Sequence, residues 1–142
     1  MMIRKLQNAD MDRVAGIWLD ANLRAHCFIS PQYWKSNFDP VKEMLPQAEV
    51  YVYENDREIQ GFIGLNGAYI EGIFVSGEMQ SRGIGKRLLD FVKTKKTELR
   101  LNVYQKNMRA IRFYQREGFK ILREGMDEAT GEKDYEMTWR QE

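Results

Sequence analysis

A glycine-rich turn between a strand-like and a helix-like segment is the part of this chain whose backbone N–H groups are best placed to bind a ligand. Residues 68–75 are rich in β-branched and aromatic side chains, as strands are. After the turn, a helical spacing of i, i+4, i+5 and i+8 is occupied by Ile84, Leu88, Leu89 and Val92. The first N–H groups of a helix have no partners within it, so a strand–turn–helix of this kind predicts an anion site.

Two common phosphate-binding motifs do not fit this turn. A Walker-type loop requires glycine where this chain has Gln80, and Ser or Thr where it has Arg87. The dinucleotide-binding fingerprint requires a third glycine at the position of Leu88, and its turn usually follows the first strand of its domain. The anion is therefore expected to belong to another kind of ligand.

The turn itself reads Gln80-x-x-Gly83-x-Gly85. It resembles the coenzyme A signature of the GNAT (Gcn5-related) N-acetyltransferases, Gln/Arg-x-x-Gly-x-Gly/Ala. The second signature of that family, Asn-x-x-Ala-x-x-Phe-Tyr-x-x-x-Gly-Phe, is similar to residues 107–119, Asn-Met-Arg-Ala-Ile-Arg-Phe-Tyr-Gln-Arg-Glu-Gly-Phe. The segment His26-x-Phe28-Ile29 also resembles short bacterial members, several of which are described as protein lysine acetyltransferases.

The resemblance covers essentially the whole chain and implies a fold. We expect a single domain over residues 1–142 of the mixed α/β class (α+β-like). Its sheet would be mostly antiparallel, with six to seven strands and about four flanking helices. The fourth and fifth strands would splay apart to admit acetyl-CoA.

The resemblance also assigns a binding role to particular residues. Backbone groups of Ile73, Phe74 and Val75 would pair with the pantetheine amides, and Asn107 would meet the same arm from the opposite wall. Amides of the turn would surround the pyrophosphate, namely those of Gln80, Ser81, Arg82, Gly83, Ile84, Gly85 and Lys86. The implied co-substrate is acetyl-CoA, and no metal is expected.

Acetyl transfer to an amine poses two proton problems. By resemblance, Tyr114 is the general acid that protonates the departing thiolate. The acceptor amine must lose a proton, but Asn102 stands where several protein-acetylating relatives have glutamate, and an amide is no base. Glu71 is the candidate base that remains, the alternative being a strand carboxylate paired with Lys or Arg. His26 is a candidate acceptor contact, with packing as the alternative.

The acceptor is less defined than the donor. Family members acetylate antibiotics, polyamines, protein N-termini and lysines, so the fold does not select among them. The mostly acidic region 124–134 suits a primary amine that carries positive charge, on a small molecule or a peptide, the alternative being a solvated loop without a ligand. A non-catalytic acyl-CoA sensor on the same fold is the alternative function, and a homodimer is open because dimers are common in the family.

Composition narrows the remaining classes of function. The chain has 142 residues with 22 basic and 21 acidic side chains, so no global field attracts nucleic acid or an anionic membrane. Cys27 is the single cysteine, which excludes an intrachain disulfide and fits a reducing compartment. No apolar run is long enough to span a membrane. We therefore expect a cytoplasmic protein without nucleic-acid or membrane partners.

The elements that position these residues follow from hydrophobic periodicity. Helices are predicted after a cap at Asn8 or Asp10, from Pro31, in part of the stretch before Pro46, at 84–92 and at 107–117 with Gly118 as C-cap. Strands are predicted at 2–6, 50–53, 59–65, 68–75, 99–104, 119–122 and 135–139. Asn66-Gly67 predicts a type I′ hairpin, and 125–133 a polar loop.

Overall fold

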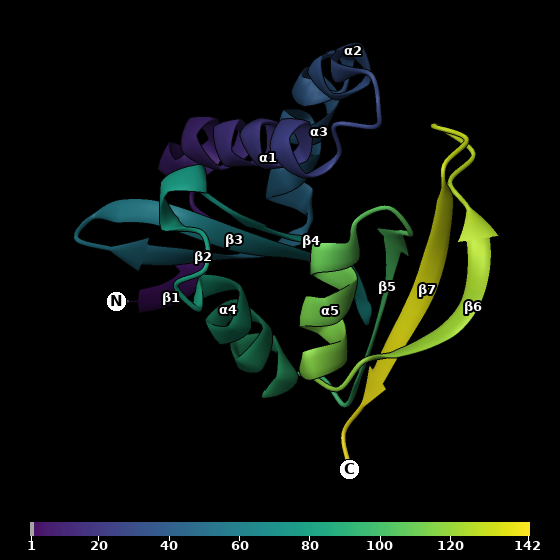
Figure 1. Cartoon of the computed structure of the whole chain (residues 1–142). Helices are drawn as coiled ribbons and strands as arrows, with labels where there is room; N and C mark the ends of the chain where they lie inside the picture. Colours follow the sequence, from purple (N-terminus) through teal and green to yellow (C-terminus); the bar gives the residue numbers. More distant parts are fainter. Residues whose placement is uncertain (1) are drawn as a thin grey trace.

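The computed structural model describes residues 2–142, which form a seven-stranded sheet flanked by five helices. Figure 1 shows α1, α2 and α3 over one face of the sheet and α4 and α5 over the other. In chain order the elements are β1 (Met2–Lys5), α1 (Met11–Ala25), α2 (Pro31–Ser36), α3 (Phe38–Met44), β2 (Glu49–Asn55), β3 (Glu58–Asn66), β4 (Tyr69–Val75), α4 (Ile84–Lys93), β5 (Glu98–Tyr104), α5 (Met108–Arg116), β6 (Lys120–Met126) and β7 (Lys133–Arg140). None of the helices within residues 2–142 is long and apolar enough to cross a membrane.

The sheet confirms the predicted fold class. Its strand order is β1-β2-β3-β4-β5-β7-β6, and every neighbouring pair is antiparallel except β4 with β5. Those two strands are parallel and meet only where Tyr69 pairs with Arg100. Beyond that pair they diverge, so the edge of β4 is left open, as the predicted splay requires.

The ends of α2 and α5 lie where the sequence chemistry predicts them, whereas Asp10 precedes α1 without a capping hydrogen bond to its side chain. The side chain of Asn107 caps α5 by accepting a hydrogen bond from the Ala110 backbone N–H at 3.2 Å. Gly118 follows the same helix with φ of 94°, a left-handed conformation that glycine adopts at little cost. Pro31 opens α2, and Ser30 accepts the Gln32 N–H there.

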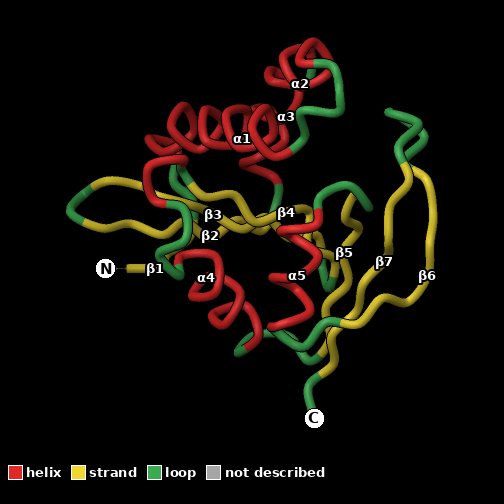
Figure 2. The backbone as a smooth tube through the Cα atoms, viewed as in Figure 1, coloured by secondary structure: helices red, strands yellow, loops and turns green. Residues whose placement is uncertain are grey.

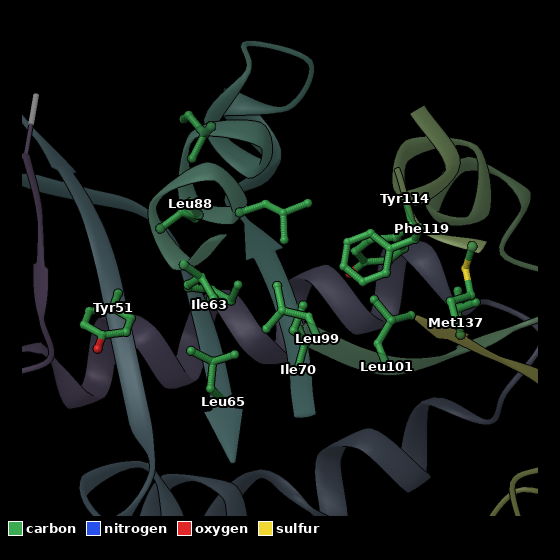
Figure 3. Packing of buried hydrophobic residues seen from close by; sticks show 14 of the residues in the cluster. Tyr51, Ile63, Leu65, Ile70, Leu88, Leu99, Leu101, Tyr114, Phe119 and Met137 are labelled. Carbon is green, nitrogen blue, oxygen red and sulfur yellow. The ribbon is translucent and has the colours of Figure 1, made fainter. Parts of the chain in front are cut away.

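The main core lies between the sheet and the α4–α5 layer. Alternation in β5 places Leu99, Leu101 and Val103 in this core, whereas Asn102 lies on the opposite face. Figure 3 shows Leu88 of α4 over the sheet, and Tyr114 of α5 beside Phe119. The core therefore fixes the two helices that carry both sequence motifs.

Two local predictions were wrong. Asn66 is a strand residue paired with Tyr69, so the hairpin turn is Gly67-Ala68 and only Gly67 has a positive φ, at 62°. This pattern fits a type II′ turn, because type I′ needs a positive φ at both central residues. The β6–β7 hairpin is longer than expected and leaves 127–132 as its loop (Figure 2). The helix predicted in part of the stretch before Pro46 is α3, so residues 2–142 contain five α-helices where about four were expected.

Candidate active site

Two adjoining cavities open where β4 and β5 separate. The first, called here the α4-side cavity, has a volume of about 660 Å³ and lies between the start of α4, the end of β4, α1 and α5. The second, the β7-side cavity, has about 610 Å³ and is walled by β4, β5, α2 and the β6–β7 loop. His26, Asn107 and Tyr114 line both cavities, so the two meet at these side chains.

The predicted anion turn forms the floor of the α4-side cavity. Ser81 and Gly83 have positive φ values of 63° and 80°, which turn the backbone into the first turn of α4. Gly83 is the residue that precedes this helix, and Gly85 lies in its first turn. Because the first N–H groups of a helix have no partner within it, this end of the cavity can bind an anionic group.

Side chains of the turn have more specific tasks than the sequence indicated. Gln80 donates through Nε2 to the Val75 carbonyl at 3.2 Å, so this backbone group, predicted to serve pantetheine, already has a partner. Ser81 Oγ accepts from Arg109 at 2.6 Å. Lys86 pairs with Asp90 at 3.2 Å and Glu117 at 3.0 Å, so carboxylates offset much of its charge.

Sequence reasoning missed the principal cations of this cavity. Arg109, Arg112 and Arg116 line it from α5. Their spacing of i, i+3 and i+7 places them along one face of a helix, a signal that was readable in the sequence. The α4-side cavity is therefore cationic, which suits a ligand that carries several phosphates.

Tyr114 stands where the two cavities meet. Its side chain is 8 % exposed and packs edge-on against Phe113 and Phe119. No described residue hydrogen-bonds its hydroxyl, and the residue lines both cavities. Burial raises the pKa of Tyr114 above that of an ordinary phenol, and the nearby Tyr69 hydroxyl adds to the effect. The phenol is thus neutral at physiological pH and has a proton to donate.

His26 joins α1 to α5 through a continuous set of hydrogen bonds. Its Nδ1 lies 3.0 Å from Asn22 Oδ1, and its Nε2 lies 3.1 Å from Asn107 Nδ2. Asn107 uses Oδ1 to cap α5, so its Nδ2 donates and His26 Nε2 must accept. His26 Nδ1 therefore carries the proton and donates to Asn22, whose own amide donates to the Trp18 carbonyl. The ring is neutral, stacks on Trp34 and orients Asn107.

This arrangement makes a prediction about acid. Burial lowers the pKa of His26 from 6.5 to about 4, so the unfolded chain takes up a proton there before the folded protein does. Stability from the neutral ring is complete above pH 6.5 and is lost as the pH falls toward 4. In thermal unfolding from pH 7.5 to 4.5, the wild type should lose more stability than His26→Phe, which keeps an aromatic ring. Parallel curves for the two proteins would contradict the assignment.

Glu71 lies on the wall of the β7-side cavity, together with Tyr69 and Ile73. It occupies a β-bulge, because Gly64 pairs with Gly72 and Leu65 with Ile70, which leaves Glu71 as the extra residue. The Glu71 side chain is exposed, and no Lys or Arg of residues 2–142 forms an ion pair with it. The paired alternative considered from the sequence is therefore not what the structure shows.

The β7-side cavity has the opposite charge to its neighbour. Four carboxylates line it, those of Glu71, Asp127, Glu128 and Asp134, and none of its described lining residues is Lys or Arg. Two of them come from the loop predicted to be acidic, and Asp134 belongs to β7. No group of three or more His, Cys, Asp or Glu side chains within residues 2–142 is arranged to hold a metal ion.

Comparison with known proteins agrees with this geometry. Residues 46–121 match the family model described as acetyltransferase (GNAT) domain. The chain is 34% identical over 140 residues to the peptidyl-lysine N-acetyltransferase YiaC of Escherichia coli, covering 97% of this chain and 96% of that protein.

Solved structures share the fold along nearly the whole chain. The solution structure of apo YjaB from Escherichia coli superposes with a TM-score of 0.87 at 25% identity, covering 99% of this chain and 98% of that one. The PaiA N-acetyltransferase of Thermoplasma acidophilum, solved in complex with coenzyme A, gives 0.82 at 23% identity and covers 98% of each chain. The family model, the relative and the fold agree, and the chain belongs to the GNAT family of acetyltransferases, enzymes that use acetyl-CoA.

Proposed function

We propose that this protein transfers the acetyl group of acetyl-CoA to the side-chain amine of a lysine in a peptide or protein. The observation that carries the proposal is the opposite charge of two cavities that meet at Tyr114. A cationic cavity suits the phosphates of the donor, and an acidic one suits an acceptor that arrives as an ammonium ion. The names of the relatives YiaC and YjaB support a peptidyl-lysine acceptor.

The donor side is proposed to bind acetyl-CoA through backbone more than side chains. The N–H groups at Gly83, Ile84, Gly85 and Lys86 would hold the pyrophosphate, and the arginines of α5 would contact the remaining phosphate. The open edge of β4 at Ile73 and Phe74 would pair with the pantetheine amides, as an added strand pairs with a sheet. Asn107, held in one orientation by His26, would meet the arm from α5.

The proposed chemistry uses direct attack of the amine on the thioester. Tyr114 would donate its proton to the departing sulfur, because burial raises the pKa of the phenol and so keeps it neutral, with its proton in place, at physiological pH. A lysine with a pKa of about 10.4 is protonated at pH 7, so a base must remove a proton before attack. Glu71 was the candidate base from the sequence. It lines the β7-side cavity, so it remains one of the carboxylates that would meet the acceptor.

The acceptor class can be tested with a panel of amines followed by mass spectrometry and CoA release. The panel should contain basic peptides with one free lysine and a blocked N-terminus, matched peptides with only a free α-amine, a polyamine and a neutral primary amine. We expect acetylation of the lysine peptides, and more of it at low salt because charge attraction is screened by ions. Turnover of neutral amines alone would refute the acceptor class, and stabilisation by CoA without turnover on any amine would favour the sensor.

A further inference from the structure

Asp134 is a buried carboxylate on the wall of the β7-side cavity. Its side chain is 8 % exposed, and no Lys or Arg within residues 2–142 forms an ion pair with it. Its side chain has one hydrogen-bond partner among the described residues, Asn102 Nδ2, at the long distance of 3.5 Å. Burying a charge with so little compensation costs stability, so structure alone does not account for this residue.

The position of Asp134 relates it directly to Asn102. In the β5–β7 ladder Asn102 pairs with Glu136, and Tyr104 with Asp134, so Asn102 and Asp134 are diagonal neighbours on one face of the sheet. That face lies opposite the core residues Leu101 and Val103 and forms part of the β7-side cavity. Asp134 thus presents a carboxylate beside the β5 position at which this chain lacks one.

The surroundings of Asp134 leave room and add negative charge. Its partner in β6 is Gly125, where a Cβ would lie 2.9 Å from Asp134 Oδ1, so the absence of a side chain makes space for the carboxylate. Burial raises the pKa of Asp134, and the nearby charges of Asp127 and Glu136 raise it further, whereas the Asn102 hydrogen bond lowers it. A carboxylate with a raised pKa is a stronger base than an ordinary surface aspartate.

The geometry points to Asp134 as the general base for the acceptor amine, supplying from β7 the carboxylate that Asn102 does not supply from β5. This inference rests on the proposed function. Asp134 is favoured over Glu71 because Asp134 is buried beside Asn102 and Tyr69, whereas Glu71 is exposed at a bulge. Glu71 then serves to attract the ammonium ion.

The proton balance of the reaction follows from this assignment. The acceptor ammonium ion gives one proton to Asp134, and the free amine attacks the thioester carbonyl carbon. The C–N bond forms and the C–S bond breaks, and the sulfur takes the proton of Tyr114. The attacking nitrogen loses a second proton as the amide forms, and this proton replaces the one that Tyr114 gave. Asp134 then releases its own proton to solvent.

Asp134→Asn is the variant that tests the inference, with kinetics measured on the best amine of the panel. We expect kcat to fall by about 10²-fold or more, the usual size of a general-base contribution, with the affinity for acetyl-CoA unchanged. The acid limb of the pH profile of kcat/KM should disappear. Glu132→Gln is the matched control, because it removes the same charge two residues before Asp134, from a side chain that pairs with Lys106 and does not line the cavity.

Two further measurements keep the test independent of folding. Because the pKa of Asp134 is raised in the folded protein, its charged form opposes folding above that pKa, so Asp134→Asn should not lower Tm at pH 8. Adding Asn102→Glu to Asp134→Asn returns a carboxylate to β5, and activity should recover by about tenfold or more.

The outcomes separate this inference from the proposed function. If lysine peptides are acetylated and Asp134→Asn keeps kcat within about twofold, Asp134 is not the base and the proposed function stands. If another amine is the acceptor, the lysine proposal fails, and Asp134 is judged on that amine. A fall in Tm of Asp134→Asn at pH 8 would show that the carboxylate is a structural group and would overturn the inference, whatever the acceptor is.

Discussion

Replacing Tyr114 with phenylalanine is expected to lower kcat for acetyl transfer by about 10²- to 10³-fold while leaving the affinity for acetyl-CoA within about twofold. Phenylalanine keeps the packing against Phe113 and Phe119 and removes only the hydroxyl. Since no described residue hydrogen-bonds that hydroxyl, its loss leaves no buried group without a partner. We therefore expect slow turnover in steady-state kinetics, normal CoA binding in calorimetry and a normal Tm in thermal unfolding.

Tyr135→Phe is the matched control for this experiment. Tyr135 lies on β7 and packs against the same core, but it is not among the residues that line either cavity. Removing the hydroxyl of Tyr135 should leave kcat unchanged. If Tyr114→Phe also retained full turnover with a competent acceptor, the thiolate would have to leave without a proton from this residue, and the general-acid assignment would be wrong.

Local sequence chemistry predicted the elements that carry the site. The alternation of Leu99, Leu101 and Val103, and the Asn107 cap with Gly118 at the far end of α5, are each decided within a few residues. The open edge of β4 was predicted through the family resemblance, and the β4–β5 pairing bears it out. The predictions of β5 and α5 succeeded because short-range pattern and backbone preference are sufficient to decide them.

Other features depend on strand register and tertiary contacts, which no local pattern contains. Gly67-Ala68 forms the turn where Asn66-Gly67 was expected, because pairing of Asn66 with Tyr69 extends the ladder by one residue. Lys86 belongs to the turn expected to surround the pyrophosphate, but its ammonium group pairs with Glu117, which lies far along the chain. Asp134 was counted in the acidic region 124–134, and its burial depends on β7 lying between β5 and β6.

Under the proposed function, the two cavities would separate donor from acceptor. The cations Arg109, Arg112 and Arg116 come from a single helix, whereas the opposing carboxylates come from β4, β7 and the loop that joins β6 to β7. The proposed acceptor wall would thus be built from segments other than the helix proposed to contact the donor. This arrangement accounts for a fold that is shared widely while acceptors differ.

Gly85→Val is expected to weaken acetyl-CoA binding by about 50-fold or more, equivalent to about 2.3 kcal/mol, without unfolding the protein. A Cβ at Gly85 would lie 3.6 Å from the Phe113 ring and 3.8 Å from Ile73 Cγ2, which is ordinary contact, so the empty protein accommodates it. A branched side chain there would nevertheless occupy the space above the first N–H groups of α4. The phosphates would then be held away from these N–H donors, and water would have to satisfy the donors instead.

A graded series of side chains at position 85 tests this expectation. When both variants are titrated with CoA by calorimetry, Gly85→Ala should weaken binding less than Gly85→Val. Gly16→Ala is the control: Gly16 lies exposed in α1, a Cβ there would contact nothing within 4 Å, and the change should raise stability by about 0.5–1 kcal/mol with binding unchanged. Affinity for CoA that stayed near the wild-type value in Gly85→Val would mean that the pyrophosphate does not lie against the start of α4. The arginines of α5 would then have to hold the donor's phosphates without help from the turn.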